Sequence, residues 1–77
     1  MTQRVSEDDF LAFAARVLGV SPGALTLDSA YGAFPTWDSV MHLRLAMEFE
    51  VAWGVRLPFD EVPQMVRLRD FYERLSR

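Results

Sequence analysis

The chain has 77 residues, which fits one domain spanning residues 1–77, and its hydrophobic share of 51% excludes a disordered chain. The chain has no cysteine, so it can form neither a disulfide nor a cysteine-ligated zinc site, and the lack of disulfides suits the cytoplasm. Because it also has only one histidine, no metal site is expected. A net charge of −3 argues against a nucleic-acid partner, because binding phosphates needs a basic surface. No apolar run is long enough to cross a membrane, so no membrane partner is expected.

The sequence predicts a first helix that begins after Ser6 and ends at Gly19. Ser6 is a suitable N-cap, and the acidic residues 7–9 suit the positive end of the helix dipole. The apolar residues that follow recur at helical spacing and form one face: Phe10, Leu11, Phe13, Ala14, Val17 and Leu18. A glycine after the last of them is typical of a helix end.

A long connection follows, from about Val20 to Trp37. Connections of this length are uncommon in compact domains and often serve a function. Several apolar residues along it are expected to anchor it to the core: Leu25, Leu27, Tyr31, Phe34 and Trp37.

A second helix is expected to begin at Asp38-Ser39 and to run to about Trp53, where Gly54 ends it. Asp38 is a good N-cap, which leaves Ser39 at the first helical position.

The rest of the chain predicts one short helical turn within residues 60–64 and a last helix from about Arg67 to Leu75. No segment alternates as a strand would. The expected fold class is therefore all-α, a small four-helix bundle of three main helices and one short helix, with the long loop between the first two main helices.

The second helix has two apolar faces when it is drawn at about 100° per residue. The face expected to enter the core carries Leu43, Ala46, Phe49 and Trp53, with Leu45 at its margin. A separate apolar stripe consists of Val40, Met47 and Val51, and Arg44 and Glu48 flank it. An exposed stripe with a charged border is typical of a docking surface, whereas the ordinary alternative is that it packs under the long loop.

Ser39 stands where a phosphate ester on its side chain would meet unpaired backbone N–H groups and the positive end of the helix dipole. The alternative is that Asp38 caps the helix and a serine is simply tolerated after it. The same dipeptide occurs at Asp28-Ser29 with no helix behind it, so Asp-Ser alone indicates little.

The arrangement of the whole chain resembles the acyl carrier protein family, in which a serine after an aspartate opens the second helix of a four-helix bundle. The motif stands here as Asp38-Ser39-Val40, where the family usually has leucine in the third place. The resemblance continues through MHLRLAMEFEVAWGVRLP, residues 41–58, and through FDEVPQMVRLRDFYERL, residues 59–75.

The resemblance implies that a phosphopantetheinyl transferase attaches 4′-phosphopantetheine from coenzyme A to Ser39, and that Asp38 is the motif residue adjacent to the attachment site. The arm then carries an acyl or aminoacyl group as a thioester, and the carrier, expected to be a monomer, catalyses nothing itself. An acyltransferase, ketosynthase or adenylating enzyme would dock on the second helix, and the family positions for that contact are Val40, Arg44, Met47 and Val51.

Two of these positions depart from the carriers of fatty acid synthesis, which tend to be acidic where this chain has Arg44 and Val51. Rim charges mainly set partner choice and association rate. The Trp-Asp-Ser sequence looks more like discrete carriers of specialised pathways, in polyketide, aminoacyl or related assembly.

Two other functions compete with the carrier. Ser39, His42 and Asp38 are the residue types of a hydrolase triad, but their spacing gives poor triad geometry, and His42 is expected to be a partly exposed helix residue near Trp53 or the loop. A helical adaptor that binds a partner through the apolar stripe and is never modified would share the fold and the docking face.

Overall fold

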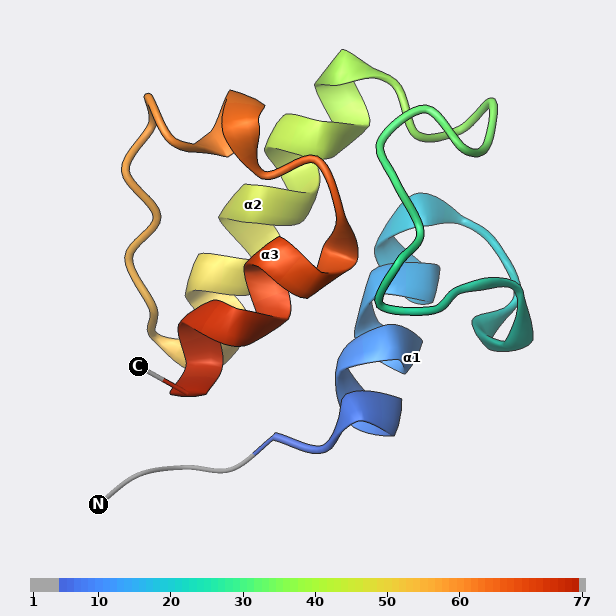
Figure 1. Cartoon of the computed structure of the whole chain (residues 1–77), viewed down its shortest axis with the longest axis horizontal. Coiled ribbons are helices and arrows are strands. Elements are labelled where there is room, and N and C mark those ends of the chain that lie inside the picture. Colours follow the sequence, from blue (N-terminus) through green and yellow to red (C-terminus); the bar gives the residue numbers. More distant parts are fainter. Residues whose placement is uncertain (1–4, 77) are drawn as a thin grey trace.

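The computed structural model describes residues 5–76, and it consists of three α-helices joined by loops and single 3₁₀ turns (Figure 1). The helices are α1 (Glu7–Leu18), α2 (Ser39–Trp53) and α3 (Leu68–Tyr72). The 3₁₀ turns are η1 (Pro22–Ala24), η2 (Val62–Gln64) and η3 (Glu73–Ser76). Within residues 5–76 the β-type pairing is a single isolated bridge between Ala30 and Arg67, so the expected all-α class is confirmed.

The helix ends lie where the capping residues predict them. The Ser6 hydroxyl accepts a hydrogen bond from Asp9 N at 3.0 Å, and the Asp38 carboxylate accepts one from Met41 N at 2.9 Å. Gly19 and Gly54 end α1 and α2 in the left-handed conformation, with φ of 73° and 65°. Glycine is the residue that adopts this conformation without a steric penalty, which explains both stops.

The last part of the chain is less regularly helical than its sequence predicts. The turn expected within residues 60–64 is a three-residue 3₁₀ turn, η2. The helix expected from about Arg67 to Leu75 is α-helical for five residues and then tightens into η3. The Asp70 carboxylate accepts a hydrogen bond from Arg67 N at 3.0 Å and so stabilises the start of α3.

Aromatic side chains from all three helices meet in the core. Phe10 of α1 and Phe49 of α2 lie edge to face, with ring centroids 6.0 Å apart, and Phe49 meets Phe71 of α3 at 5.7 Å. Phe13 packs on Trp53 at 4.6 Å. Edge-to-face pairs add a favourable quadrupole interaction to the burial of their large apolar surfaces.

The buried face of α2 differs from the expected one at two leucines. Leu45, expected at the margin, is fully buried, whereas Leu43, expected in the core, is 40% exposed. The buried residues are His42, Leu45, Ala46 and Phe49, and at about 100° per residue they centre on an arc that includes Leu45 and leaves Leu43 outside it.

The loop between α1 and α2 is fixed against both the core and α3. Three of its expected anchors, Leu25, Leu27 and Trp37, are buried, whereas Phe34 is half-buried and Tyr31 is exposed. The carbonyl groups of Ser29 and Leu27 accept hydrogen bonds from Leu68 N at 3.1 Å and Arg69 N at 2.8 Å. The Asp28 carboxylate also pairs with the Arg69 guanidinium at 2.9 Å. Asp28-Ser29 therefore has a structural role at the start of α3.

Candidate functional site

Ser39 is the first residue of α2, and its side chain is exposed to solvent. Asp38 fixes the turn that presents it. The Asp38 carboxylate accepts a hydrogen bond from Met41 N, and the Asp38 carbonyl accepts one from His42 N at 2.9 Å. The first turn of the helix is therefore held from both the side chain and the backbone of one residue, which places the serine hydroxyl at a defined position at the helix start.

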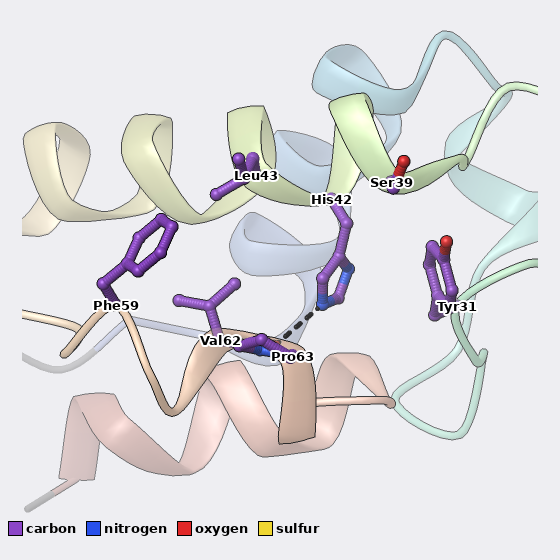
Figure 2. Close-up of a pocket in the computed structure, with 7 residues that line it drawn as sticks. All are labelled: Tyr31, Ser39, His42, Leu43, Phe59, Val62 and Pro63. Carbon is purple, nitrogen blue, oxygen red and sulfur yellow. Dashed lines mark hydrogen bonds between the residues drawn. The ribbon is translucent and has the colours of Figure 1, made fainter.

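A partly open cavity of about 280 Å³ lies beside Ser39 (Figure 2). It is formed by three segments that are far apart in the sequence: the long loop, the first turns of α2 and the segment around η2. The lining residues are Tyr31, Ser39, His42, Leu43, Phe59, Val62 and Pro63. Most of these side chains are apolar, so the cavity suits an apolar group better than a charged one.

His42 lies at the base of this cavity with both ring nitrogens engaged. Trp37 Nε1 donates a hydrogen bond to His42 Nδ1 at 3.0 Å, and His42 Nε2 lies 3.1 Å from the Val62 carbonyl oxygen. The indole N–H can only donate, so Nδ1 is the acceptor and the proton of the neutral ring sits on Nε2. The sequence-based expectation of a partly exposed histidine is wrong, since His42 is 7% exposed.

The surroundings of His42 favour its neutral form. Burial lowers the pKa of His42, because the protein interior solvates the imidazolium less well than water does. The backbone carbonyls of Val62 and Met65 act in the opposite direction and offset part of this effect.

Asp38, Ser39 and His42 do not form a hydrolase triad. Both nitrogens of His42 are bonded to Trp37 and Val62, so neither is left to take a proton from Ser39. Figure 2 shows the Ser39 hydroxyl and the imidazole pointing away from each other. The Asp38 carboxylate bonds Met41 N and not the histidine. The three residues thus lack the hydrogen-bonded chain that activates a serine nucleophile.

The apolar stripe on α2 is exposed along its length. Val40, Met47 and Val51 are 71%, 62% and 84% exposed, so the alternative that the long loop covers them does not hold. Arg44, at the edge of the stripe, forms an i,i+4 ion pair with Glu48 at 3.6 Å. Both side chains of that pair are largely in solvent, where such a pair contributes little to stability.

The cavity includes four residues that sequence reasoning did not connect with Ser39: Tyr31, Phe59, Val62 and Pro63. Tyr31 was expected only as a loop anchor. A local signal existed for His42, because it follows Ser39 by three residues and so shares its side of the helix. No local signal connects residues 59–63 with Ser39, because packing alone brings that segment across α2.

Neither the protein-family models nor the curated proteins contain a match to this chain. Among residues 5–76, no group of three or more histidine, aspartate or glutamate side chains is arranged to hold a metal ion. In the same range, no helix combines the length and the apolar character needed to span a membrane.

Proposed function

We propose that this chain is an acyl carrier protein whose 4′-phosphopantetheine arm is attached to Ser39. The observation that carries the proposal is the exposed Ser39 hydroxyl, held by the Asp38 cap at the start of α2 and at the edge of an apolar cavity. In this proposal α1, α2, α3 and the short helical segment around η2 correspond to a four-helix bundle. The chain acts as a single non-catalytic domain and works as a cytoplasmic monomer.

The attachment is a phosphoryl transfer carried out by a separate phosphopantetheinyl transferase with Mg²⁺. The Ser39 oxygen forms a bond to the pantetheine-bearing phosphorus of coenzyme A, the bond from that phosphorus to the adenosine bisphosphate breaks, and the serine proton is lost. Met41 N and His42 N already have acceptors on Asp38. The N–H groups of Ser39 and Val40 are the first-turn donors that remain for the new phosphodiester.

The exposed apolar stripe supports the partner side of the proposal. Val40, Met47 and Val51, with Arg44 at the border, form the surface on which an acyltransferase, ketosynthase or adenylating enzyme docks. The stripe begins one residue after Ser39, so a docked enzyme has its active site near the arm. Tethering raises the effective concentration of the thioester at each such enzyme. The cationic Arg44 and aliphatic Val51 argue against a carrier of fatty acid synthesis, and the Trp-Asp-Ser sequence favours a polyketide or related specialised pathway.

The second candidate is an unmodified helical adaptor, and the same exposed stripe favours it. An apolar surface on a helix serves partner binding whether or not Ser39 is modified. The two functions differ in one chemical property, because the carrier requires a reactive hydroxyl at Ser39 and the adaptor does not.

The distinguishing experiment is the intact mass of the protein after incubation with coenzyme A, Mg²⁺ and a transferase of broad specificity. The carrier function predicts one phosphopantetheinyl increment on the wild type and none on Ser39→Ala. Ser29→Ala is a matched control, because it removes the serine of the other Asp-Ser pair and should be modified like the wild type. It also removes the acceptor of Thr26 N, so circular dichroism should verify that this variant is folded. If the wild type gains no mass while a known carrier does, the adaptor becomes the better proposal.

A further inference from the structure

His42 connects the two sides of the cavity at Ser39. Its Nδ1 accepts the hydrogen bond from Trp37, which lies in the loop segment directly before Asp38. Its Nε2 donates to the carbonyl of Val62 in η2, on the other side of the cavity. Figure 2 shows the imidazole between Tyr31 and Val62, below the first turn of α2. One side chain thus joins the loop, α2 and η2 next to the exposed serine.

The bond to Trp37 exists only while His42 is neutral. A proton on Nδ1 places an N–H group opposite the indole N–H, and two donors cannot form a hydrogen bond. Trp37 is 1% exposed, so loss of this acceptor leaves a buried N–H unsatisfied, which is unfavourable. The bond to Val62 is unaffected, because Nε2 carries a proton in both states. Protonation therefore acts on the loop side of the cavity alone.

Within residues 5–76, the groups that contact the imidazole are aromatic rings and backbone carbonyls, and none of them is a carboxylate that would hold it in the protonated form. The Tyr31 ring lies 5.0 Å from the imidazole and the Phe71 ring 5.6 Å, measured between centroids, and the tyrosine is the titratable group that faces it. Most carboxylates on the surrounding elements are engaged elsewhere: Asp28 with Arg69, Asp38 with Met41 N, Glu48 with Arg44, Glu50 with Leu57 N, Glu61 with Arg74 and Asp70 with Arg67 N. Asp60, in the segment before η2, is exposed to solvent. Burial also lowers the pKa of His42, so the protonated state is reached only in acid.

The loop wall of the cavity is the Tyr31 side chain, which rests on His42 and on Trp37, whereas Trp37 itself is buried in the apolar core. Tyr31 packs against Trp37 with ring centroids 6.4 Å apart and against His42, but its own side chain is exposed. Its backbone is tied to α3 by the bond from Tyr31 N to the Val66 carbonyl at 2.7 Å. Loss of the bond to His42 thus leaves the Trp37 indole N–H without its acceptor and loosens the tyrosine side chain that rests on both rings, while the burial of Trp37 and the attachment of the loop to α3 remain.

We infer that His42 is a positioning residue whose neutral imidazole, bonded to Trp37, holds the Tyr31 side chain at the cavity beside Ser39, and that protonation of Nδ1 breaks the bond to Trp37 and loosens this tyrosine wall on the loop side of the cavity. The inference concerns access to the site and applies to the unmodified chain, so it does not rest on attachment of an arm to Ser39. It assigns to the chain a pH-sensitive control of the space next to its exposed serine.

The test is a titration of the ¹⁵N-labelled chain by NMR between about pH 8 and 5. The sequence has one histidine and two tryptophans, so the imidazole signals are unambiguous and the Trp53 indole is an internal control. The expected result is that the Trp37 indole signal shifts with the same midpoint as His42. Its exchange with water, measured relative to the Trp53 indole, rises roughly tenfold.

Two variants separate this role from a merely structural one. In His42→Gln the side-chain amide keeps one acceptor and one donor but cannot titrate, so the Trp37 signal becomes independent of pH. Trp37→Phe keeps the ring and removes the indole N–H, so the midpoint of His42 moves up because its neutral form loses a donor. Should His42→Gln not fold, the Trp37→Phe titration decides alone.

Either of two results would overturn the inference. In the first, His42 titrates while the Trp37 indole stays unchanged. In the second, the Trp53 indole and the Phe10 ring signals move together with those of Trp37, which would mean that the proton unfolds the core and does not open a cavity.

Discussion

Leu45 and Leu43 form a matched pair on α2 for testing which side of the helix faces the core. Both are leucines in the same helix two residues apart, but Leu45 is fully buried and Leu43 is 40% exposed at the cavity. Replacement of each by alanine therefore changes the same chemical groups in two different environments.

The expected costs follow from that difference in burial. Leu45→Ala removes buried core atoms and leaves a void that the close-packed core fills only in part, so we expect a loss of about 3 kcal/mol in the free energy of unfolding. Leu43→Ala loses only part of the burial energy and opens onto an existing cavity, so we expect about 1 kcal/mol or less. A domain of 77 residues has a total stability of roughly 4–12 kcal/mol, so the first variant loses a large share of it.

Urea unfolding at pH 7.5, followed by far-UV circular dichroism and tryptophan fluorescence, measures both costs. The slope of free energy against urea concentration should be unchanged, which verifies that the two variants unfold from the same native state. The reasoning fails if Leu43→Ala costs as much as Leu45→Ala. That outcome would mean that the core lies on the side of α2 that the simple helical pattern of the sequence indicates.

Two further predictions concern the start of α2. The pKa of His42 is lowered by burial, so its contribution to stability is complete above about pH 6.5 and is lost as the pH falls through the lowered folded-state value. Measured by urea unfolding, the free energy of unfolding of the wild type should fall by up to about 1.4 kcal/mol more than that of His42→Gln between pH 7.5 and 5.5. A difference between the two proteins that stays constant over this pH range would contradict the prediction. Asp38→Ala removes the side-chain cap on Met41 N and should cost about 1 kcal/mol, seen as a fall of roughly 4–8 °C in the melting temperature. Asp60→Ala, an exposed acidic residue outside the helices, is the charge-matched control and should melt within about 2 °C of the wild type.

The ends of α1 and α2 were predictable because they depend on local chemistry. A capping side chain and the backbone N–H it binds are three residues apart, as with Ser6 and Asp9 or Asp38 and Met41. The glycines that end both helices act through their own backbone conformation. Features of this kind are complete within one turn of the chain, so the sequence contains all that is needed to recognise them.

The orientation of α2 was harder to predict because the helix is apolar on most of its circumference. A pattern of that kind permits several core faces, and the choice depends on which neighbours pack against it. His42 added to the error, since a polar residue type is ordinarily assigned to the surface, whereas here it is buried between Trp37 and Val62. The cavity could not be foreseen either, because it exists only where residues 59–63 meet the loop and α2.

The dependence of α3 on the long loop has a consequence for how the protein folds. Helices shorter than about 12 residues are marginal on their own in water, because the first turn costs more backbone entropy than its hydrogen bonds return. The five-residue α3 begins with N–H groups of Leu68 and Arg69 that are bonded to the loop carbonyls of Ser29 and Leu27. The loop therefore supplies acceptors that stabilise the start of α3 and that the short helix lacks on its own. The two segments, about forty residues apart in the chain, gain and lose their structure as one cooperative unit.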